Sequence, residues 1–153
     1  MIGVLVVSHE PLGTALIRCT RHIYGRLPPQ LAALDVIPDE DPQLACQAAR
    51  ELLLRINDGT GVIVFTDLFG ATPSRIARTL ADPHRVAVIA GVNLPLLVKA
   101  LNNRRSPLVE VIANLVDSGR QAIFEIGRDP DEEAPAPGST TNQRGGSVTP
   151  ANK

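Results

Sequence analysis

Two side chains of this sequence could carry out nucleophilic chemistry together. His9 follows the apolar run VLVVS, and Asp67 follows the apolar run GVIVFT. An imidazole can act as a nucleophile, and a carboxylate beside it can fix one ring tautomer and stabilise the ring as it becomes cationic. If the fold brings the two residues together, the pair would suit a site that accepts a labile group and passes it on.

The segment after Asp67, DLFGATPSR, adds features that favour an anionic ligand. Gly70 gives the chain a flexible turn, Thr72 is a suitable N-cap and Pro73 suits the first helical position. A helix start offers unpaired backbone N–H groups and a positive dipole end, which suit a phosphate. The positive charge of Arg75 is unfavourable near the positive end of the helix dipole, but it would attract an anion. The candidate phosphate-binding residues are Gly70, Ala71, Thr72 and Ser74.

Each residue also has an ordinary structural explanation. His9 alone could be a loop histidine at the end of a strand, and Asp67 alone could bond to backbone amides in a turn. The acidic run 39–41 falls where a helix must begin, and helix starts attract acids. His22 fits an exposed helix surface, and His84 fits a turn. The combination of His9 and Asp67 at neighbouring strand ends is what favours function.

The order of apolar runs predicts an α/β fold. In 153 residues, 44% are hydrophobic but only 3% are aromatic, so the core must be aliphatic. The alternation predicts a doubly wound, mostly parallel sheet with helices on both faces. In the flavodoxin-like strand order the first and third strands are neighbours, and ligands bind where the order reverses. Strands are predicted over 2–8, 32–37, 61–67, 86–90 and 120–126, with helices near 12–25, 41–57, 73–81, 94–102 and 106–118.

Composition limits the other classes of function. The predicted domain covers residues 1–127, and a tail over 128–153, rich in Pro, Gly and Ser, is predicted to be disordered.

Lys and Arg number 15 against 16 Asp and Glu, with no basic stripe, so nucleic acid is not an expected partner. No signal peptide or membrane span is evident, and two isolated cysteines fit a reduced cytoplasmic protein. No metal-ligand spacing or nucleotide motif occurs, so neither a metal nor another cofactor is expected.

Three motifs together resemble one family. GVLVVSHEPLG, GVIVFTDLFGATPSR and VIAGVNLPLLVKAL are similar, in order and spacing, to the enzyme IIA component of the mannose/fructose/sorbose class of the bacterial phosphoenolpyruvate-dependent sugar phosphotransferase system. The resemblance covers about residues 1–126. It implies that His9 accepts a phosphoryl group from the carrier protein HPr and passes it to an enzyme IIB, so that the chain is a phosphotransferase. It also implies that Asp67 orients the ring and that Thr72 lies near the phosphoryl group.

The resemblance further implies a homodimer in which the last strand is exchanged between subunits, antiparallel to the others. Contact with a membrane would come only through transporter subunits. The tail contains no IIB domain, so the expected acceptor is a separate chain.

The sequence departs from the family pattern beside the site. Glu10 stands where Gly is common, Ala71 replaces a second Gly, and Ser74-Arg75 replaces the usual Phe-Asn. A carboxylate at residue 10 would repel a phosphoryl group unless it turns away or pairs with a base such as Arg75. Two alternatives therefore remain: a receiver domain phosphorylated on Asp67, and a regulatory phosphoprotein of the same fold that takes no part in sugar transport.

Overall fold

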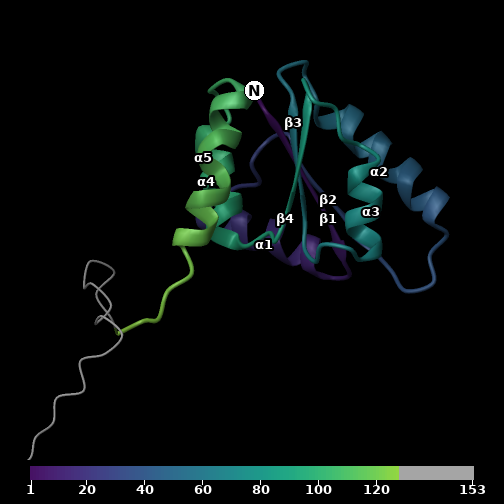
Figure 1. Cartoon of the computed structure of the whole chain (residues 1–153), viewed down its shortest axis with the longest axis horizontal. Helices are drawn as coiled ribbons and strands as arrows, with labels where there is room; N and C mark the ends of the chain where they lie inside the picture. The colour runs from purple at the N-terminus through teal and green to yellow at the C-terminus, as the bar shows by residue number, and fades with distance from the viewer. Residues whose placement is uncertain (128–153) are drawn as a thin grey trace, which may run out of the picture. The chain divides into compact units, whose positions relative to one another are not determined.

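Four strands and five helices are formed by residues 1–127, which are the residues described in this computed structural model (Figure 1). The strands are β1 (Gly3–His9), β2 (Leu31–Val36), β3 (Val62–Thr66) and β4 (Val86–Ala90). The helices are α1 (Leu12–Tyr24), α2 (Pro42–Ile56), α3 (Thr72–Arg78), α4 (Leu94–Asn103) and α5 (Leu108–Gln121). No helix among these residues is long and apolar enough to cross a membrane.

The strands form one parallel sheet in the order β2-β1-β3-β4. The central strand β1 is paired with β2 on one side and with β3 on the other, and Val7 lies opposite Thr66. The carboxyl ends of all four strands therefore meet at one edge. The order of connection reverses between β1 and β3, so the predicted doubly wound fold and its switch point are confirmed.

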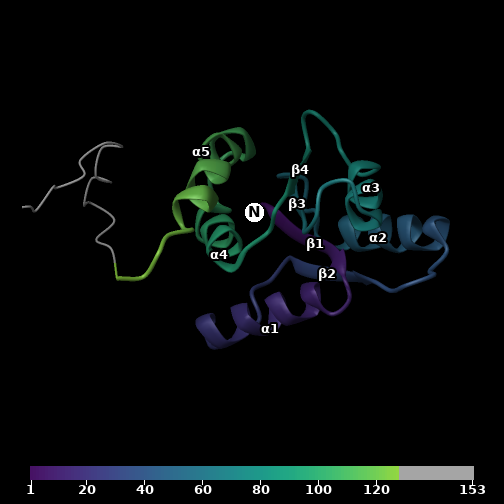
Figure 2. The same ribbon diagram turned by 60° about the horizontal axis from the view of Figure 1, so that its bottom comes forward.

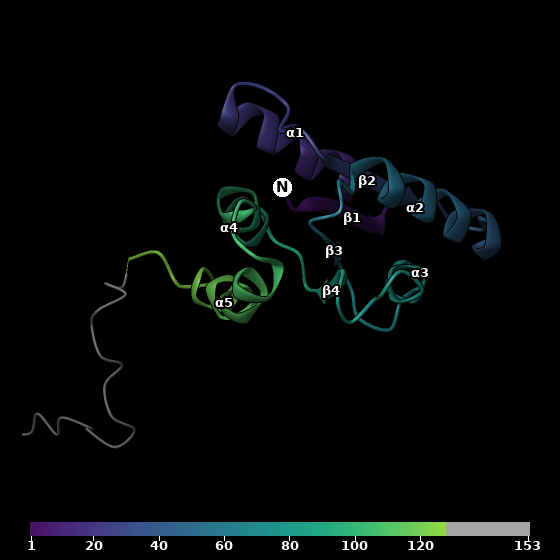
Figure 3. The ribbon, with the colours of Figure 1, turned by 90° about the horizontal axis from the view of Figure 1, so that it is seen from above.

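Helices cover both faces of the sheet, as the continuous apolar strands require. One face packs against α1, α4 and α5 through a cluster that includes Val6, Phe65 and Leu97. The other face packs against α2 and α3 through a cluster that includes Val64 and Ile76. Figures 2 and 3 show the two groups of helices on either side of the strands.

Local signals in the sequence set the ends of several helices. The Asp41 side chain accepts a hydrogen bond from the Gln43 backbone N–H at 2.8 Å and caps α2. Asn93 caps α4 in the same way through the Leu96 backbone N–H, also at 2.8 Å. Helix α1 ends at Gly25, which adopts the left-handed conformation with φ of 70°.

Two sequence-based expectations about local structure are wrong. The predicted strand over 120–126 does not form within the described residues, because α5 continues through Gln121 and residues 122–127 are irregular. Gly119 lets the last turn of α5 pack closely on α4, because a Cβ atom there would lie 2.9 Å from Leu96. The N-cap of α3 is Ala71 rather than Thr72, and no side chain caps this helix.

Residues Met1–Ile123 form one compact unit that contains every strand and helix named above. The predicted tail over 128–153 lies outside the described residues.

Candidate active site

His9 is the last residue of β1, and Asp67 follows β3 directly, so the parallel pairing of these strands brings the two side chains together. His9 Nδ1 lies 2.7 Å from Asp67 Oδ2, and the backbone N–H of His9 donates to the same oxygen at 3.0 Å. A carboxylate only accepts hydrogen bonds, so Nδ1 carries the proton and Nε2 keeps its lone pair. The His9 side chain is 52% exposed, whereas that of Asp67 is only 15% exposed.

The carboxylate of Asp67 is held in its charged form. Burial raises its pKa, but the hydrogen bonds from the backbone and ring of His9 outweigh burial, and the pKa is lowered overall. Its second oxygen, Oδ1, is buried and has no hydrogen-bond partner among residues 1–127. The Gly91 N–H donates to the Asp67 carbonyl at 2.9 Å, which ties the loop after β3 to the end of β4.

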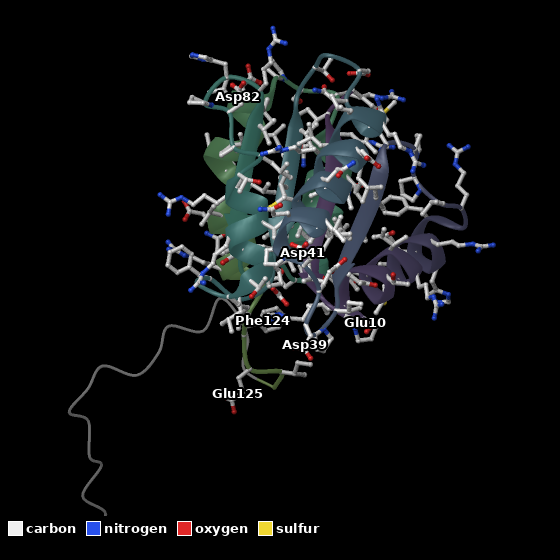
Figure 4. All side chains as sticks on the ribbon, turned by 90° about the vertical axis from the view of Figure 1, so that its right-hand side faces the viewer. Glu10, Asp39, Asp41, Asp82, Phe124 and Glu125 are labelled. Atoms are coloured by element: carbon white, nitrogen blue, oxygen red, sulfur yellow. The ribbon has the colours of Figure 1, made fainter. Side chains whose placement is uncertain are left out.

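A cavity of about 520 Å³ opens beside His9 and has an acidic rim. Its walls come from the ends of β1 and β2, the loop before α2 and the start of α3. Glu10, Asp39 and Glu40 contribute carboxylates to it, and no described cation forms an ion pair with any of them. Figure 4 shows Glu10 and Asp39 at the end of the molecule opposite Asp82, which precedes β4. The lining residues are His9, Glu10, Val36, Ile37, Pro38, Asp39, Glu40, Pro42 and Thr72.

Of the four candidate phosphate-binding residues, Thr72 lines the cavity of His9, and Gly70, Ala71 and Ser74 are not among its lining residues. The Gly70 N–H donates to Ser74 Oγ at 2.9 Å, and the Ala71 N–H donates to the Leu68 carbonyl at 3.3 Å. The Ser74 hydroxyl in turn donates to the Ala71 carbonyl at 2.8 Å. Gly70 and Ser74 line a different cavity, between α3 and β4. The loop therefore uses these groups to hold its own conformation.

Two residues set aside on sequence grounds do reach the site. Asp41 caps a helix as expected, but Asp39 and Glu40 line the cavity of His9. Their position in the loop after β2 could have predicted this, because the carboxyl end of β2 lies beside that of β1, where His9 is located. The suggested pairing of Glu10 with Arg75 does not form in the described part of the chain, where neither residue takes part in an ion pair.

This arrangement presents a nucleophilic nitrogen to solvent while a partly buried carboxylate holds the other side of the ring. Ring orientation and tautomer are both set before any ligand arrives. Nε2 can attack an electrophilic centre, and the positive charge that develops on the ring is stabilised by Asp67. Thr72 lines the same cavity.

Comparison with known proteins identifies the family. A family model described as "PTS system fructose IIA component" matches residues 3–116. The mannose-specific EIIAB component of Escherichia coli K12 is 27% identical over 140 residues, which are 89% of this chain but only 43% of that protein. The fructose-specific EIIA component of Bacillus subtilis 168 is 28% identical over 127 residues, covering 82% of this chain and 86% of that protein.

The fold has close counterparts among solved structures. The phosphotransferase system component EIIA from Streptococcus agalactiae superposes with a TM-score of 0.72 at 20% identity. The match covers 82% of this chain and 97% of that one, so it extends over nearly all of the compact unit. The family match over residues 3–116 includes β1 with His9 and β3 with the Asp67 loop. The chain belongs to the IIA components of the mannose/fructose/sorbose class of the bacterial sugar phosphotransferase system.

Proposed function

We propose that the chain is a phosphocarrier in which Nε2 of His9 accepts a phosphoryl group from phospho-HPr and passes it to an enzyme IIB during sugar uptake. The observation that carries this proposal is the 2.7 Å contact between His9 Nδ1 and Asp67 Oδ2, which leaves Nε2 as the nucleophile. Family membership supports the class of reaction, and the geometry supports the choice of atoms.

In the first transfer, the Nε2 lone pair attacks phosphorus, and the N–P bond in the donor breaks as the new N–P bond forms. The electron pair of the broken bond returns to the imidazole of the donor. The ring of His9 becomes cationic, and Asp67 compensates that charge through Nδ1–H. The second transfer is the reverse displacement, with a nucleophile of the acceptor protein attacking phosphorus and His9 leaving as the neutral ring.

The acidic rim affects the energy of the phosphorylated state. Glu10, Asp39 and Glu40 place negative charge around the cavity in which the phosphoryl oxygens must lie. Like charges repel, so the rim destabilises phosphohistidine relative to the free ring. A carrier needs such a bond to be easily broken again. The rim therefore favours release of the group to an acceptor and, to the same extent, opposes its uptake from the donor.

The test is phosphoryl transfer from phosphoenolpyruvate through enzyme I and HPr. We expect the wild-type chain to take one acid-labile label and the His9→Ala variant to take none. The variants His22→Ala and His84→Ala are matched controls, since both histidines are exposed and lie outside the site. Label retained by His9→Ala would overturn the proposal, and an acyl phosphate on Asp67 would point to a receiver domain.

The acceptor is tested separately from the donor. The phosphorylated chain should lose its label when an IIB protein of the mannose/fructose/sorbose class is added. Label that forms normally on His9 but is never passed to such a protein would contradict the transport role. That result would support a regulatory phosphoprotein.

A further inference from the structure

A second cavity, of about 360 Å³, lies between α3 and the strands β3 and β4. It shares no lining residue with the cavity of His9. Its walls combine two cations with hydroxyl and apolar groups. The lining residues are Thr66, Phe69, Gly70, Ser74, Arg75, Arg78, Val88 and Ala90.

Arg75 and Arg78 give this cavity uncompensated positive charge. They are three residues apart in α3, a spacing that places both side chains on the same side of a helix. Neither forms an ion pair with a carboxylate in the part of the chain that the structure describes. The first turn of α3 also contains no acidic residue. The two guanidinium groups are therefore available to an anion.

Thr66 provides an independent sign of a missing partner. The residue is only 1% exposed, and its Oγ1 has no hydrogen-bond partner among residues 1–127. Buried hydroxyl groups in proteins are nearly always hydrogen-bonded, so this one requires an explanation. Ser74 does not satisfy it: the Ser74 hydroxyl donates to Ala71 and accepts from Gly70, and among the described residues it makes no hydrogen bond with Thr66. A ligand oxygen in the cavity would supply the acceptor.

We infer that this cavity binds a phosphate group, either as free phosphate or as part of a small phosphate monoester. The planar guanidinium groups of Arg75 and Arg78 suit bidentate contacts to phosphate oxygens, and Thr66 Oγ1–H adds a third direction of donation. Phe69 is 85% exposed beside them and, with Val88 and Ala90, offers an apolar wall for the organic part of an ester. The volume is within the usual range for small-molecule sites.

This inference does not rest on phosphoryl transfer by His9. The test is titration of the full, unphosphorylated chain, followed by the backbone amide resonances in NMR, with inorganic phosphate and with glucose 6-phosphate. Sodium chloride at matched ionic strength serves as the reference. We expect saturable shifts at Thr66, Ser74 and Arg75. Tighter binding of glucose 6-phosphate would identify an ester as the ligand, and equal or tighter binding of phosphate would identify the free ion.

Variants separate a specific site from general charge attraction. Thr66→Val keeps the shape of the side chain and removes the donor, and Arg75→Gln and Arg78→Gln each remove one cation. Each should weaken binding about tenfold. Two control variants should leave binding unchanged. One is His9→Ala, and the other is Arg18→Gln, which changes an exposed arginine of α1 on the opposite face of the sheet. Thermal unfolding of each variant confirms that it is folded.

Three outcomes would overturn the inference. In the first, Arg18→Gln weakens phosphate binding as much as the variants of the cavity do. In the second, a folded Thr66→Val variant binds phosphate as tightly as the wild type. In the third, the amide resonances that shift belong only to residues of the His9 cavity. A loss of phosphorylation at His9 with phosphate binding intact would affect only the proposed carrier function.

Discussion

At the scale of single residues, the site depends on one oxygen atom. Asp67 Oδ2 accepts from both the backbone N–H and the ring of His9, so it fixes the end of β1 and the imidazole at once. This double contact restricts rotation of the ring before a phosphoryl donor arrives. A nucleophile held in this way loses less freedom on reaching the transition state than a freely rotating one.

Asp67→Ala should slow phosphorylation of His9 without preventing it. The variant retains Nε2 but loses the tautomer control and the stabilisation of the cationic ring. We expect the initial rate of label transfer from phospho-HPr to fall by roughly 10²–10⁴. Asp39→Asn, which alters a carboxylate in the same cavity without contact to the ring, is the control. A folded Asp67→Ala variant with the wild-type rate would show that the carboxylate has no role in the transfer.

Asp67 should also give the protein a pH-dependent part of its stability. Burial raises its pKa, but the His9 hydrogen bonds lower it further, so the folded chain binds this proton less readily than the unfolded chain. The resulting stabilisation is fully present above the unfolded pKa of about 4 and is lost as pH falls through the lower folded value. Urea unfolding of the wild type and Asp67→Asn between pH 3 and 7 measures it.

The difference in unfolding free energy between these two proteins should be constant near neutral pH and should shrink below about pH 4. A difference that grows on acidification would show that the folded pKa is raised and that burial outweighs the hydrogen bonds.

At the scale of the elements, the start of α1 is stabilised from another part of the chain. Its N-cap is Pro11, and no side chain of its own caps it. Asp35 of β2 instead accepts from the Thr14 N–H, through Oδ1 at 3.1 Å and Oδ2 at 3.3 Å. Gly13 allows this approach, since a Cβ atom there would lie 2.7 Å from Asp35 Oδ1. Glycine therefore lets the helix start sit directly against the sheet.

Asp35→Ala should destabilise the protein by about 1 kcal/mol, the usual effect of removing a capping side chain. The expected reason is an unsatisfied N–H in the first turn of α1. Urea unfolding at neutral pH measures the change. Asp117→Ala is the control, because the only described partner of Asp117 is Arg120, in an exposed pair at 3.7 Å. An effect of Asp35→Ala no larger than that of the control would show that water replaces the cap.

The sequence was sufficient for features that depend on local pattern. Continuous apolar runs predicted four of the strands, and Asp41 with Pro42 predicted the start of α2. The pairing of His9 with Asp67 also followed, because parallel strands and a switch point place the two strand ends side by side. These inferences needed no knowledge of side-chain packing.

Features that depend on contacts between distant segments could not be predicted. The cap from Asp35 to Thr14 joins two elements, and no local pattern signals it. The backbone N–H groups near Gly70 to Ser74 were expected to be open to a phosphate, and that of Gly70 donates instead to Ser74 Oγ. The apolar pattern over 120–126 suggested a strand, yet a strand forms only where another strand is available to pair with it.

At the scale of the whole molecule, the sheet ends at β4. This edge strand, Val86–Ala90, consists of apolar residues, and no described strand pairs with its outer side. Uncharged edge strands readily pair with strands of other chains. The segment 122–126 is apolar except for Glu125, and Ile126 within it is 93% exposed. The family resemblance implies an exchange of the last strand between subunits.

We therefore expect a homodimer in which the 122–126 segment of each chain pairs with β4 of the other. Sedimentation at micromolar concentration should give twice the monomer mass for the wild type. Phe124→Asp together with Ile126→Asp should shift the protein to monomers, because a charged side chain buried at an interface is costly. Val109→Asp changes another exposed apolar residue, in α5, and should leave the dimer intact. A monomeric wild type would exclude the exchange, and a dimer unaffected by the paired substitution would place the interface elsewhere on the molecule.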